Sequence, residues 1–317
     1  MLLILTNSQD ATANYLCPIL SNEGIDYQRL DTDRVLDQAQ LGFTDVQPWL
    51  EIEGVRLRPD EIHTIWLRRP ERLRKRTGSE DVNSDFAVTE WTAALEGYLA
   101  HVAEERWVNH AAANAHASSK IRQLTLAASL GLRVPESVVT QSADVARQLA
   151  ERWNGRIIAK PLSSAAVSGS DGSRLLIFTN DVGLDDLEED DCLAACPTLF
   201  QERIQKAIDV RVTVIDGNLH PVGLRAGDAP GNQRTDIRRN NMVDVIYESV
   251  TLPDGVRRRI LELMSIYRLR FAAIDMAVST EGEWVFFEVN PNGQWAWMDL
   301  AGATSIADSF LKSFSQT

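Results

Sequence analysis

The sequence is poor in cysteine and in positive charge, and it has no long hydrophobic run. Its 3 cysteines are too few, and odd in number, for a disulfide framework, which favours the reducing cytoplasm. Lysine and arginine number 32 against 45 acidic residues, and the net charge of −13 argues against nucleic-acid binding but permits a basic peptide partner. No apolar stretch is long enough to span a membrane, so no membrane partner is expected.

Strand and helix patterns alternate over residues 1–110 and predict an open α/β layer like that of a Rossmann fold. The apolar start lacks a basic region before it, so it is typical of a first buried strand and not of a signal peptide. No Gly-x-Gly-x-x-Gly motif follows it, which argues against a dinucleotide site. The predicted strands are residues 2–5, 26–30, 62–67 and 107–109, and the predicted helices are residues 11–22 and 86–105.

The middle of the chain pairs two lysines with regular elements. Lys120 opens a helix that Gly131 ends, and Ser142 caps a second helix that runs to about Trp153. A strand then ends on Lys160, directly before Pro161. The small-residue loop 163–173 follows, and its backbone can approach phosphate oxygens as a lid, or it is a simple hairpin connection.

A hairpin near the C-terminus carries oxygen-bearing side chains on both strands. Its strands are residues 271–278 and 284–290, and the turn 280–283 lies between them. Alternation along the second strand puts Glu288 and Asn290 on one face, and Asp275 comes from the first strand. Such oxygens suit Mg²⁺, which is held by one or two carboxylates plus substrate phosphates. The alternative is a hairpin whose polar side chains face water.

The order of these features resembles that of the ATP-grasp ligases. The run Glu-Val-Asn-Pro-Asn-Gly-Gln-Trp at 288–295 is similar to the microviridin-type (graspetide) branch, which crosslinks ribosomal peptides. The resemblance covers residues 108–308, and Arg68-Arg69-Pro70 extends it loosely into the N-terminal third. It implies an α/β (α+β) ATP-grasp fold in which two lobes clamp ATP. The implied divisions are an N-terminal domain at 1–110, a central lobe at 111–198 and a C-terminal lobe at 199–317.

The resemblance also implies roles for individual residues. Lys120 and Lys160 would meet nucleotide phosphates, the linker 201–204 the adenine, and Asp209 the ribose hydroxyls. One or two Mg²⁺ ions would bind Asp275, Glu288 and Asn290. The implied ATP ligands are Lys120, Lys160, Gln201, Glu202, Arg203, Ile204, Asp209, Arg238 and Asn240.

Three residues would act in catalysis by the same resemblance. Arg211 would meet the transferring phosphate, and Arg238 would stabilise the acyl phosphate and its tetrahedral successor. Asp236 would be the acidic partner of this arginine or of the nucleophile. The chain has Thr-Asp-Ile-Arg at 235–238 where the microviridin-type ligases have Asp-Trp-Arg, a departure that bears on the peptide substrate.

The implied reaction is ATP-dependent activation of Asp or Glu side chains in a precursor peptide that carries a leader sequence. A Thr or Ser hydroxyl or a Lys amine then closes an ester or amide crosslink. The acidic run 185–191 is either solvated surface or the site that binds the leader sequence. The basic run 68–76 would face an acidic core peptide. A homodimer is expected by analogy with similar ligases. The alternatives are an amino-acid or glutamate ligase acting on a small molecule or protein tail, and a nucleotide- or peptide-binding module without ligase activity.

Overall fold

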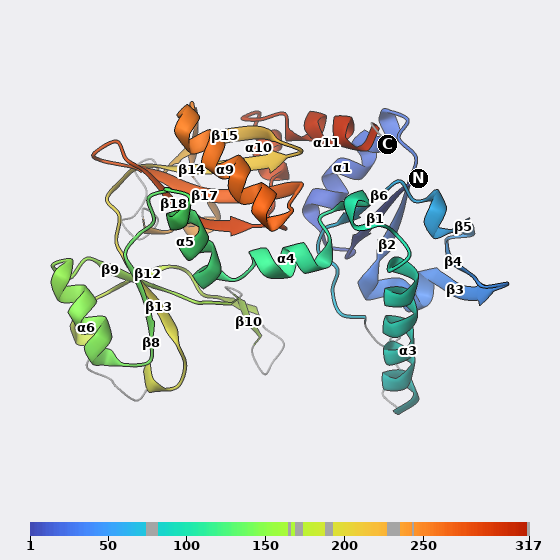
Figure 1. The fold of residues 1–317 in the computed structure, drawn as a ribbon, viewed down its shortest axis with the longest axis horizontal. Coiled ribbons are helices and arrows are strands. Elements are labelled where there is room, and N and C mark those ends of the chain that lie inside the picture. Colours follow the sequence, from blue (N-terminus) through green and yellow to red (C-terminus); the bar gives the residue numbers. More distant parts are fainter. Residues whose placement is uncertain are drawn as a thin grey trace.

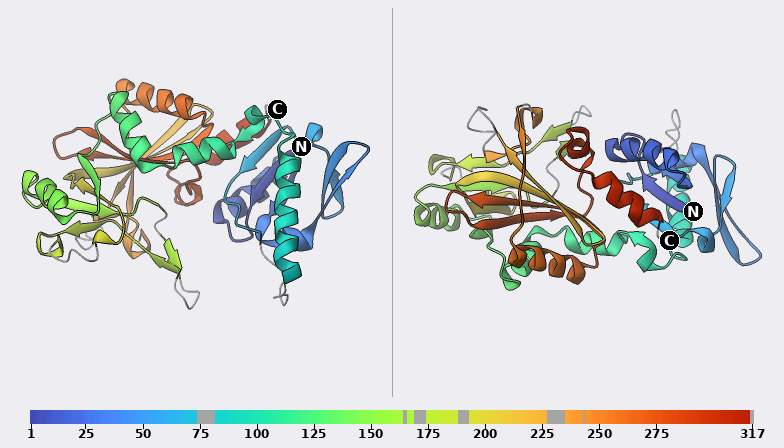
Figure 2. Two further views of the ribbon diagram at one scale, coloured as in Figure 1. Left: turned by 60° about the horizontal axis from the view of Figure 1, so that its bottom comes forward. Right: turned by 90° about the horizontal axis from the view of Figure 1, so that it is seen from above.

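The computed structural model describes residues 1–73, 82–163, 166–168, 174–187, 193–226, 235–242 and 244–315. The chain is organised in an N-terminal domain, a central lobe and a C-terminal lobe (Figure 1). The central and C-terminal lobes face each other, and the N-terminal domain stands beside them (Figure 2). Over the described ranges, no helix combines the length and apolar character needed to cross a membrane.

The N-terminal domain contains the predicted open parallel sheet, with strand order β2-β1-β6-β7. A separate antiparallel sheet, β3-β4-β5, was not predicted, because glutamine, glutamate and glycine interrupt its apolar residues. Helix α3 begins earlier and ends earlier than predicted, and Glu104–Arg106 forms a separate 3-10 turn. The elements are β1 (Leu2–Thr6), α1 (Ala11–Asn22), β2 (Tyr27–Asp31), η1 (Thr32–Arg34), α2 (Val35–Gln38), β3 (Ala39–Thr44), β4 (Gln47–Ile52), β5 (Val55–Leu57), η2 (Pro59–Glu61), β6 (Thr64–Leu67), α3 (Val82–Leu99), η3 (Glu104–Arg106) and β7 (Trp107–Val108).

The central lobe is an antiparallel sheet of order β12-β9-β13-β8, covered by one helix whose N-terminus is capped by Ser142. A short hairpin, β10-β11, extends from it, and of the predicted lid loop residues 164–165 and 169–173 lie outside the described residues. The acidic run is described only as far as its first turn, since 188–191 also lie outside. The elements are β8 (Ser137–Thr140), α6 (Ala143–Arg152), β9 (Ile157–Lys160), β10 (Ala166–Ser168), β11 (Arg174–Leu176), β12 (Asn180–Val182), η4 (Asp185–Leu187) and β13 (Thr198–Glu202).

The C-terminal lobe is a five-stranded antiparallel sheet of order β16-β15-β14-β17-β18. Helix α9 contributes to the hydrophobic core on one side of this sheet, and α10 and α11 contribute to the core on the other. The predicted metal hairpin is therefore the pair β17-β18 at one edge of the sheet. The elements are β14 (Lys206–Ile215), β15 (Asn218–Arg225), η5 (Arg239–Met242), β16 (Ile246–Ser249), α9 (Asp254–Tyr267), β17 (Phe271–Ser279), β18 (Trp284–Asn290), α10 (Ala296–Leu300) and α11 (Ile306–Ser315).

Two segments lie elsewhere than the predicted divisions place them. Helices α4 (Ala111–Ala117) and α5 (Lys120–Ser129), expected in the central lobe, pack instead into the core of the C-terminal lobe against α9. Strand β13, mostly expected in the C-terminal lobe, is hydrogen-bonded between β9 and β8 in the central sheet. The order of elements along the chain does not specify which lobe the apolar face of a helix or strand packs against, so these two placements could not be predicted from it.

The N-terminal domain shares one hydrophobic core with the C-terminal lobe. The indole of Trp295 stacks on Phe310 with ring centroids 5.0 Å apart, and Trp66 of β6 lies 5.2 Å from the same phenyl ring. All three side chains are fully buried. This shared packing fixes β6 of the N-terminal domain against the segment that directly follows β18, the strand that carries Glu288 and Asn290.

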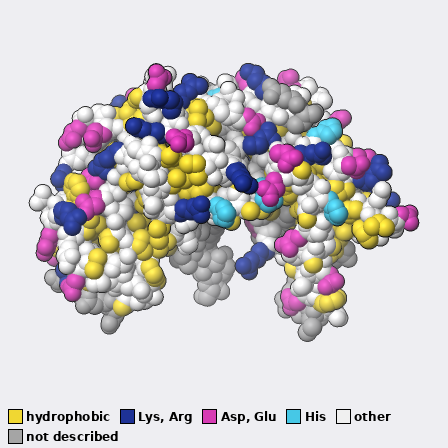
Figure 3. All heavy atoms as spheres, viewed as in Figure 1, with side chains coloured by type: hydrophobic (Ala, Val, Ile, Leu, Met, Phe, Trp, Pro, Cys, Tyr) yellow, Lys and Arg dark blue, Asp and Glu magenta, His cyan; other side chains and the backbone are white. Residues whose placement is uncertain are grey.

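The surface carries charges of both signs (Figure 3). On the face in Figure 3, basic and acidic side chains are interspersed over the described residues, and the lower outline is notched between the central lobe and the N-terminal domain. The described part of this face therefore presents no continuous basic stripe of the kind that a nucleic acid requires.

Candidate functional site

A cleft of about 1060 Å³ lies between the central and C-terminal lobes. Its floor is formed by β14, β17 and β18, and its other walls come from α5, β9 and β13. Twelve of the residues singled out from the sequence line this cleft: Lys120, Lys160, Glu202, Arg203, Ile204, Asp209, Arg211, Asp236, Arg238, Asp275, Glu288 and Asn290.

The other two candidates are placed differently. Gln201 does not line the cleft, because its buried side chain points to β8 and donates a hydrogen bond to the Ser137 hydroxyl at 2.9 Å. Asn240 belongs to η5, and its side chain lies outside the described residues. The side chain of Gln201 therefore does not face the cleft in which the sequence placed the adenine.

A β-bulge shapes the predicted metal hairpin. Asp275 is the partner of Glu288, but the next residue, Met276, pairs with Phe286, so Phe287 is an extra residue on β18. Phe287 and Glu288 consequently both line the cleft, which strict alternation does not allow. Asn290 lines it too, so the predicted common face of Glu288 and Asn290 is present.

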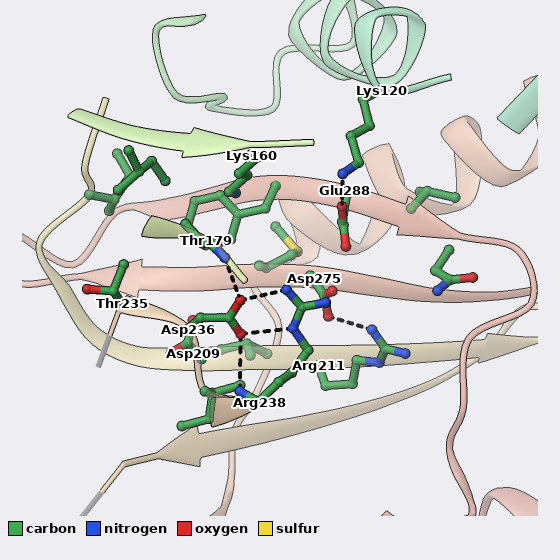
Figure 4. Close-up of a pocket in the computed structure, with 18 of the residues that line it drawn as sticks. Lys120, Lys160, Thr179, Asp209, Arg211, Thr235, Asp236, Arg238, Asp275 and Glu288 are labelled. Carbon is green, nitrogen blue, oxygen red and sulfur yellow. Dashed lines mark hydrogen bonds and ion pairs between the residues drawn. The ribbon is translucent and has the colours of Figure 1, made fainter. Parts of the chain in front are cut away.

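Each of the two hairpin carboxylates has a cationic partner from another element. Arg211 of β14 donates from Nη1 to Asp275 Oδ1 at 2.6 Å, and Lys120 Nζ lies 3.7 Å from Glu288 Oε2 (Figure 4). Lys120 Nζ also donates to the carbonyl of Pro161 at 2.6 Å. Lys120 therefore joins the central lobe to the metal hairpin of the C-terminal lobe.

The ammonium of Lys160 is placed differently. Within the described ranges, no carboxylate lies at ion-pair distance from it, and its Nζ sits 4.9 Å from the centroid of the Phe287 ring. Burial lowers the pKa of Lys160, and Lys120 and Lys206 lower it further, while Glu288 raises it. A cation with this environment, at the wall of the cleft, is a suitable binding group for a phosphate.

Asp236 and Arg238 form a bidentate pair on one side of the cleft. The Arg238 guanidinium donates to both Asp236 oxygens at 2.8 and 2.6 Å, and the Thr179 N–H donates to Oδ2 at 3.0 Å (Figure 4). Burial raises the pKa of Asp236, but the hydrogen bonds and charge of Arg238 outweigh it and set the pKa to about 2. Asp236 is thus a stable anion that orients Arg238.

Lys206 is a cleft residue that the sequence reasoning missed. Its ammonium is 2.8 Å from both oxygens of Asp209 and 3.3 Å from the Thr235 carbonyl. Residues three apart on a regular strand face opposite ways, but β14 changes register between Lys206 and Ile208, which lets this pair meet. Burial raises the pKa of Asp209, and Lys206 counteracts that rise.

The carboxylate of Glu202 is already bound by Arg133, a partner that the sequence did not indicate. Arg133 Nη2 donates to both Glu202 oxygens at 2.9 and 2.8 Å, and the Glu136 N–H donates to the same carboxylate at 3.2 Å. The predicted contact of this side chain with adenine therefore competes with a bound guanidinium. Arg133 lies in the segment before β8, 69 residues away, and no local pattern pairs the two.

The basic run 68–76 requires a correction. Arg68 does not face a peptide, because its side chain is fully buried and paired with Asp10. Arg69 is exposed and lines the cleft. Residues 74–76 lie outside the described residues.

A family model described as the RimK-like ATP-grasp domain matches residues 117–314. The chain therefore belongs to this family, it has the predicted ATP-grasp fold, and it is an ATP-dependent ligase. No curated protein sequence matches the chain significantly.

Solved structures resemble the whole chain, including its N-terminal domain. The RiPP-associated ATP-grasp ligase of Chryseobacterium gregarium, in complex with ADP and a leader and core peptide, is 26% identical, with a TM-score of 0.86 over 99% of this chain and 96% of its own. The macrocyclase MdnB of Microcystis aeruginosa MRC is 27% identical, with a TM-score of 0.79 and coverage of 99% and 98%. MdnC of the same organism, bound with the precursor peptide MdnA, is 24% identical, with a TM-score of 0.84 and coverage of 100% and 99%.

Proposed function

We propose that this protein activates Asp or Glu side chains of a ribosomal precursor peptide with ATP and closes ester or amide crosslinks within that peptide. The observation that carries the proposal is that the two lysines and two arginines expected at the phosphates line one cleft together with the two hairpin carboxylates. The likeness to peptide-bound ligases over the N-terminal domain as well as both lobes supports a peptide substrate.

The chain supplies a separate group for each part of the phosphoryl transfer. Lys120 and Lys160 would hold the phosphates, and positioning and charge neutralisation supply most of the catalysis in such reactions. A peptide carboxylate attacks the γ-phosphorus, ADP leaves, and an acyl phosphate results. Arg211 and Arg238 line the same cleft, and their guanidinium donors would stabilise the charge on the transferred group.

The second step is attack on the acyl phosphate by a hydroxyl or amine of the same peptide, with release of inorganic phosphate and of the nucleophile's proton. Asp236 fits a supporting role and not that of the base. Its pKa of about 2 makes it a poor proton acceptor, and both of its oxygens already accept hydrogen bonds from Arg238. Asp236 would therefore hold Arg238 toward the reacting phosphate.

The hairpin would hold one or two Mg²⁺ ions. Asp275, Glu288 and Asn290 offer oxygen ligands, and all three line the same cleft as Lys120 and Lys160. Bound there, the ion would neutralise phosphate charge, while Arg211 and Lys120 keep the two carboxylates oriented.

The proposal extends to partners and location. A precursor with a leader sequence is the expected peptide, with microviridin-type substrates the first class to test, and a homodimer working in the cytoplasm is the expected form. The low cysteine count supports the cytoplasm, the net charge of −13 permits a basic leader, and the homodimer rests on analogy with similar ligases.

The test is mass spectrometry of a short precursor encoded beside the gene, after incubation with the protein, ATP and Mg²⁺. We expect a loss of one water mass per crosslink, absent with Glu288→Ala. ADP formed from free amino acids, with the peptide mass unchanged, would overturn the proposal in favour of an amino-acid ligase.

A further inference from the structure

Arg68, which follows β6 in the N-terminal domain, is a fully buried arginine with 0% exposure. Its Nε lies 3.2 Å and its Nη2 3.4 Å from the two oxygens of Asp10, the residue that caps helix α1. Burial raises the pKa of Asp10, but the charge of Arg68 and hydrogen bonds from Arg68, Thr6 and Gln294 lower it more, so Asp10 is an anion. One carboxylate and one guanidinium thus form a paired buried unit.

The other side of the guanidinium reaches the turn that follows β18. Arg68 Nη1 donates to the carbonyls of Asn292 and Gly293, both at 3.0 Å, and Nη2 donates to Gln294 Oε1 at 3.1 Å. The Gln294 amide in turn donates to Asp10 at 3.3 Å. The N-terminal domain therefore holds two carbonyls and one side chain of this turn, which we call the 292–294 turn.

The same turn supports two groups of the cleft. The Gln294 carbonyl accepts a hydrogen bond from Arg211 Nη2 at 3.3 Å, while Arg211 Nη1 is bonded to Asp275. The Asn292 N–H donates to Asn290 Oδ1 at 3.0 Å. A shift of the turn would therefore move Arg211 and Asn290 together.

We propose that Arg68, paired with Asp10, is a positioning residue for catalysis that sets the 292–294 turn and, through it, Arg211 and Asn290. The activity assay of this role rests on the proposed function, whereas the hydrogen-exchange measurement of the 292–294 turn does not. A guanidinium suits the task because it presents several donors in one plane, and the single ammonium of a lysine cannot reach both Asp10 and two carbonyls.

The experiment compares three variants of the full chain. Arg68→Lys keeps the charge beside Asp10. Asp10→Asn with Arg68→Gln removes both charges together, so that no lone buried charge is left to prevent folding. Arg29→Gln is the matched control, because Arg29 is a half-buried, ion-paired arginine of the same domain whose hydrogen bonds go to Asp31, Asn14 and Asn7.

Two readouts are taken at a temperature where every variant is folded. We expect kcat for crosslinking of the precursor to fall by about 100-fold in both Arg68 variants, as for a catalytic group displaced by about 1 Å, with the KM for ATP within about threefold. Hydrogen exchange should quicken at the amides of 292–294 in both Arg68 variants but not in the control. Combining Arg68→Lys with Arg211→Lys should reduce kcat by less than the product of the two single effects.

The outcomes separate the two hypotheses. If the unaltered protein forms no crosslinks, the proposed function fails, and hydrogen exchange still decides the positioning role. Full kcat in Arg68→Lys, unchanged exchange at 292–294, or a multiplicative loss with Arg211→Lys would overturn the role of Arg68.

Discussion

Replacing Gly293 by alanine tests whether the close packing beneath Arg211 is needed for catalysis. A Cβ at this position would lie 2.4 Å from the Cβ of Ala273 and 2.6 Å from Arg211 Nη2. Carbon atoms in contact are about 3.5–4.0 Å apart, so something must move by about 1 Å or more. Ala273 is fixed in the central strand β17 and has 0% exposure, so the turn and Arg211 are the parts that yield.

Two magnitudes follow. Overpacking of this kind costs about 1–3 kcal/mol, which corresponds to a fall in Tm of roughly 2–12 °C. A displacement of a catalytic group by about 1 Å lowers kcat by roughly 100-fold. The KM for ATP should change little, because Lys120 and Lys160 lie on other elements.

The assay is the rate of ADP release with saturating ATP, Mg²⁺ and precursor, together with thermal unfolding. Gly97→Ala is the matched control. Gly97 is in helix α3, and outside that helix's own backbone no atom of the described residues lies within 4 Å of the position of a Cβ. Alanine should therefore stabilise the protein by about 0.5–1 kcal/mol and leave kcat unchanged. A Gly293→Ala protein that keeps kcat within about threefold of the original would refute the reasoning.

Three further predictions follow from the site. Lys160→Met should weaken ATP binding by about 10–100-fold in calorimetry without lowering Tm, since this lysine loses hydration but has no described carboxylate partner; a lower Tm would contradict this. The pKa of Asp236 is lowered from 3.8 to about 2 on folding, so the stability that its ionised form contributes is present above pH 4 and is lost as the pH falls toward 2. In urea titrations, the difference in unfolding free energy between the original protein and Asp236→Asn should shrink by about 2 kcal/mol over that range. A difference that stays constant with pH would contradict this prediction. Lys206→Met removes the group that lowers the pKa of Asp209, so the acid limit of ATP binding should move to higher pH. An unchanged pH profile would contradict a role for the Lys206–Asp209 pair in ATP binding.

Local signals were sufficient for many elements. Helix α1 has the predicted bounds, because Asp10 caps its start and Gly24 follows its end with a φ of 69°. The β17-β18 hairpin was predicted from two apolar runs and a short turn, and its cross-strand pairing joins the two carboxylates. These features depend on residues a few positions apart, which a sequence displays directly.

Features that were missed depend on irregular backbone or on distant partners. The bulge at Phe287 and the register change at Lys206 break the period of two, so alternation alone gives no reason to place Phe287 beside Glu288 or Lys206 beside Asp209. Arg133 and Arg68 meet their partners across 69 and more than 220 positions, and each resembles a surface arginine until the fold is known. What distinguishes both from a surface arginine is the partners that the fold brings to them.

The central claim is that ATP phosphorylates a peptide carboxylate in the cleft between the lobes. The most direct measurement labels the side-chain carboxylates of the precursor with a heavy oxygen isotope and analyses the inorganic phosphate released during crosslinking. The account predicts one labelled oxygen in each phosphate, because the carboxylate oxygen leaves with the phosphoryl group. Unlabelled phosphate, formed while crosslinks accumulate, would contradict the acyl-phosphate mechanism.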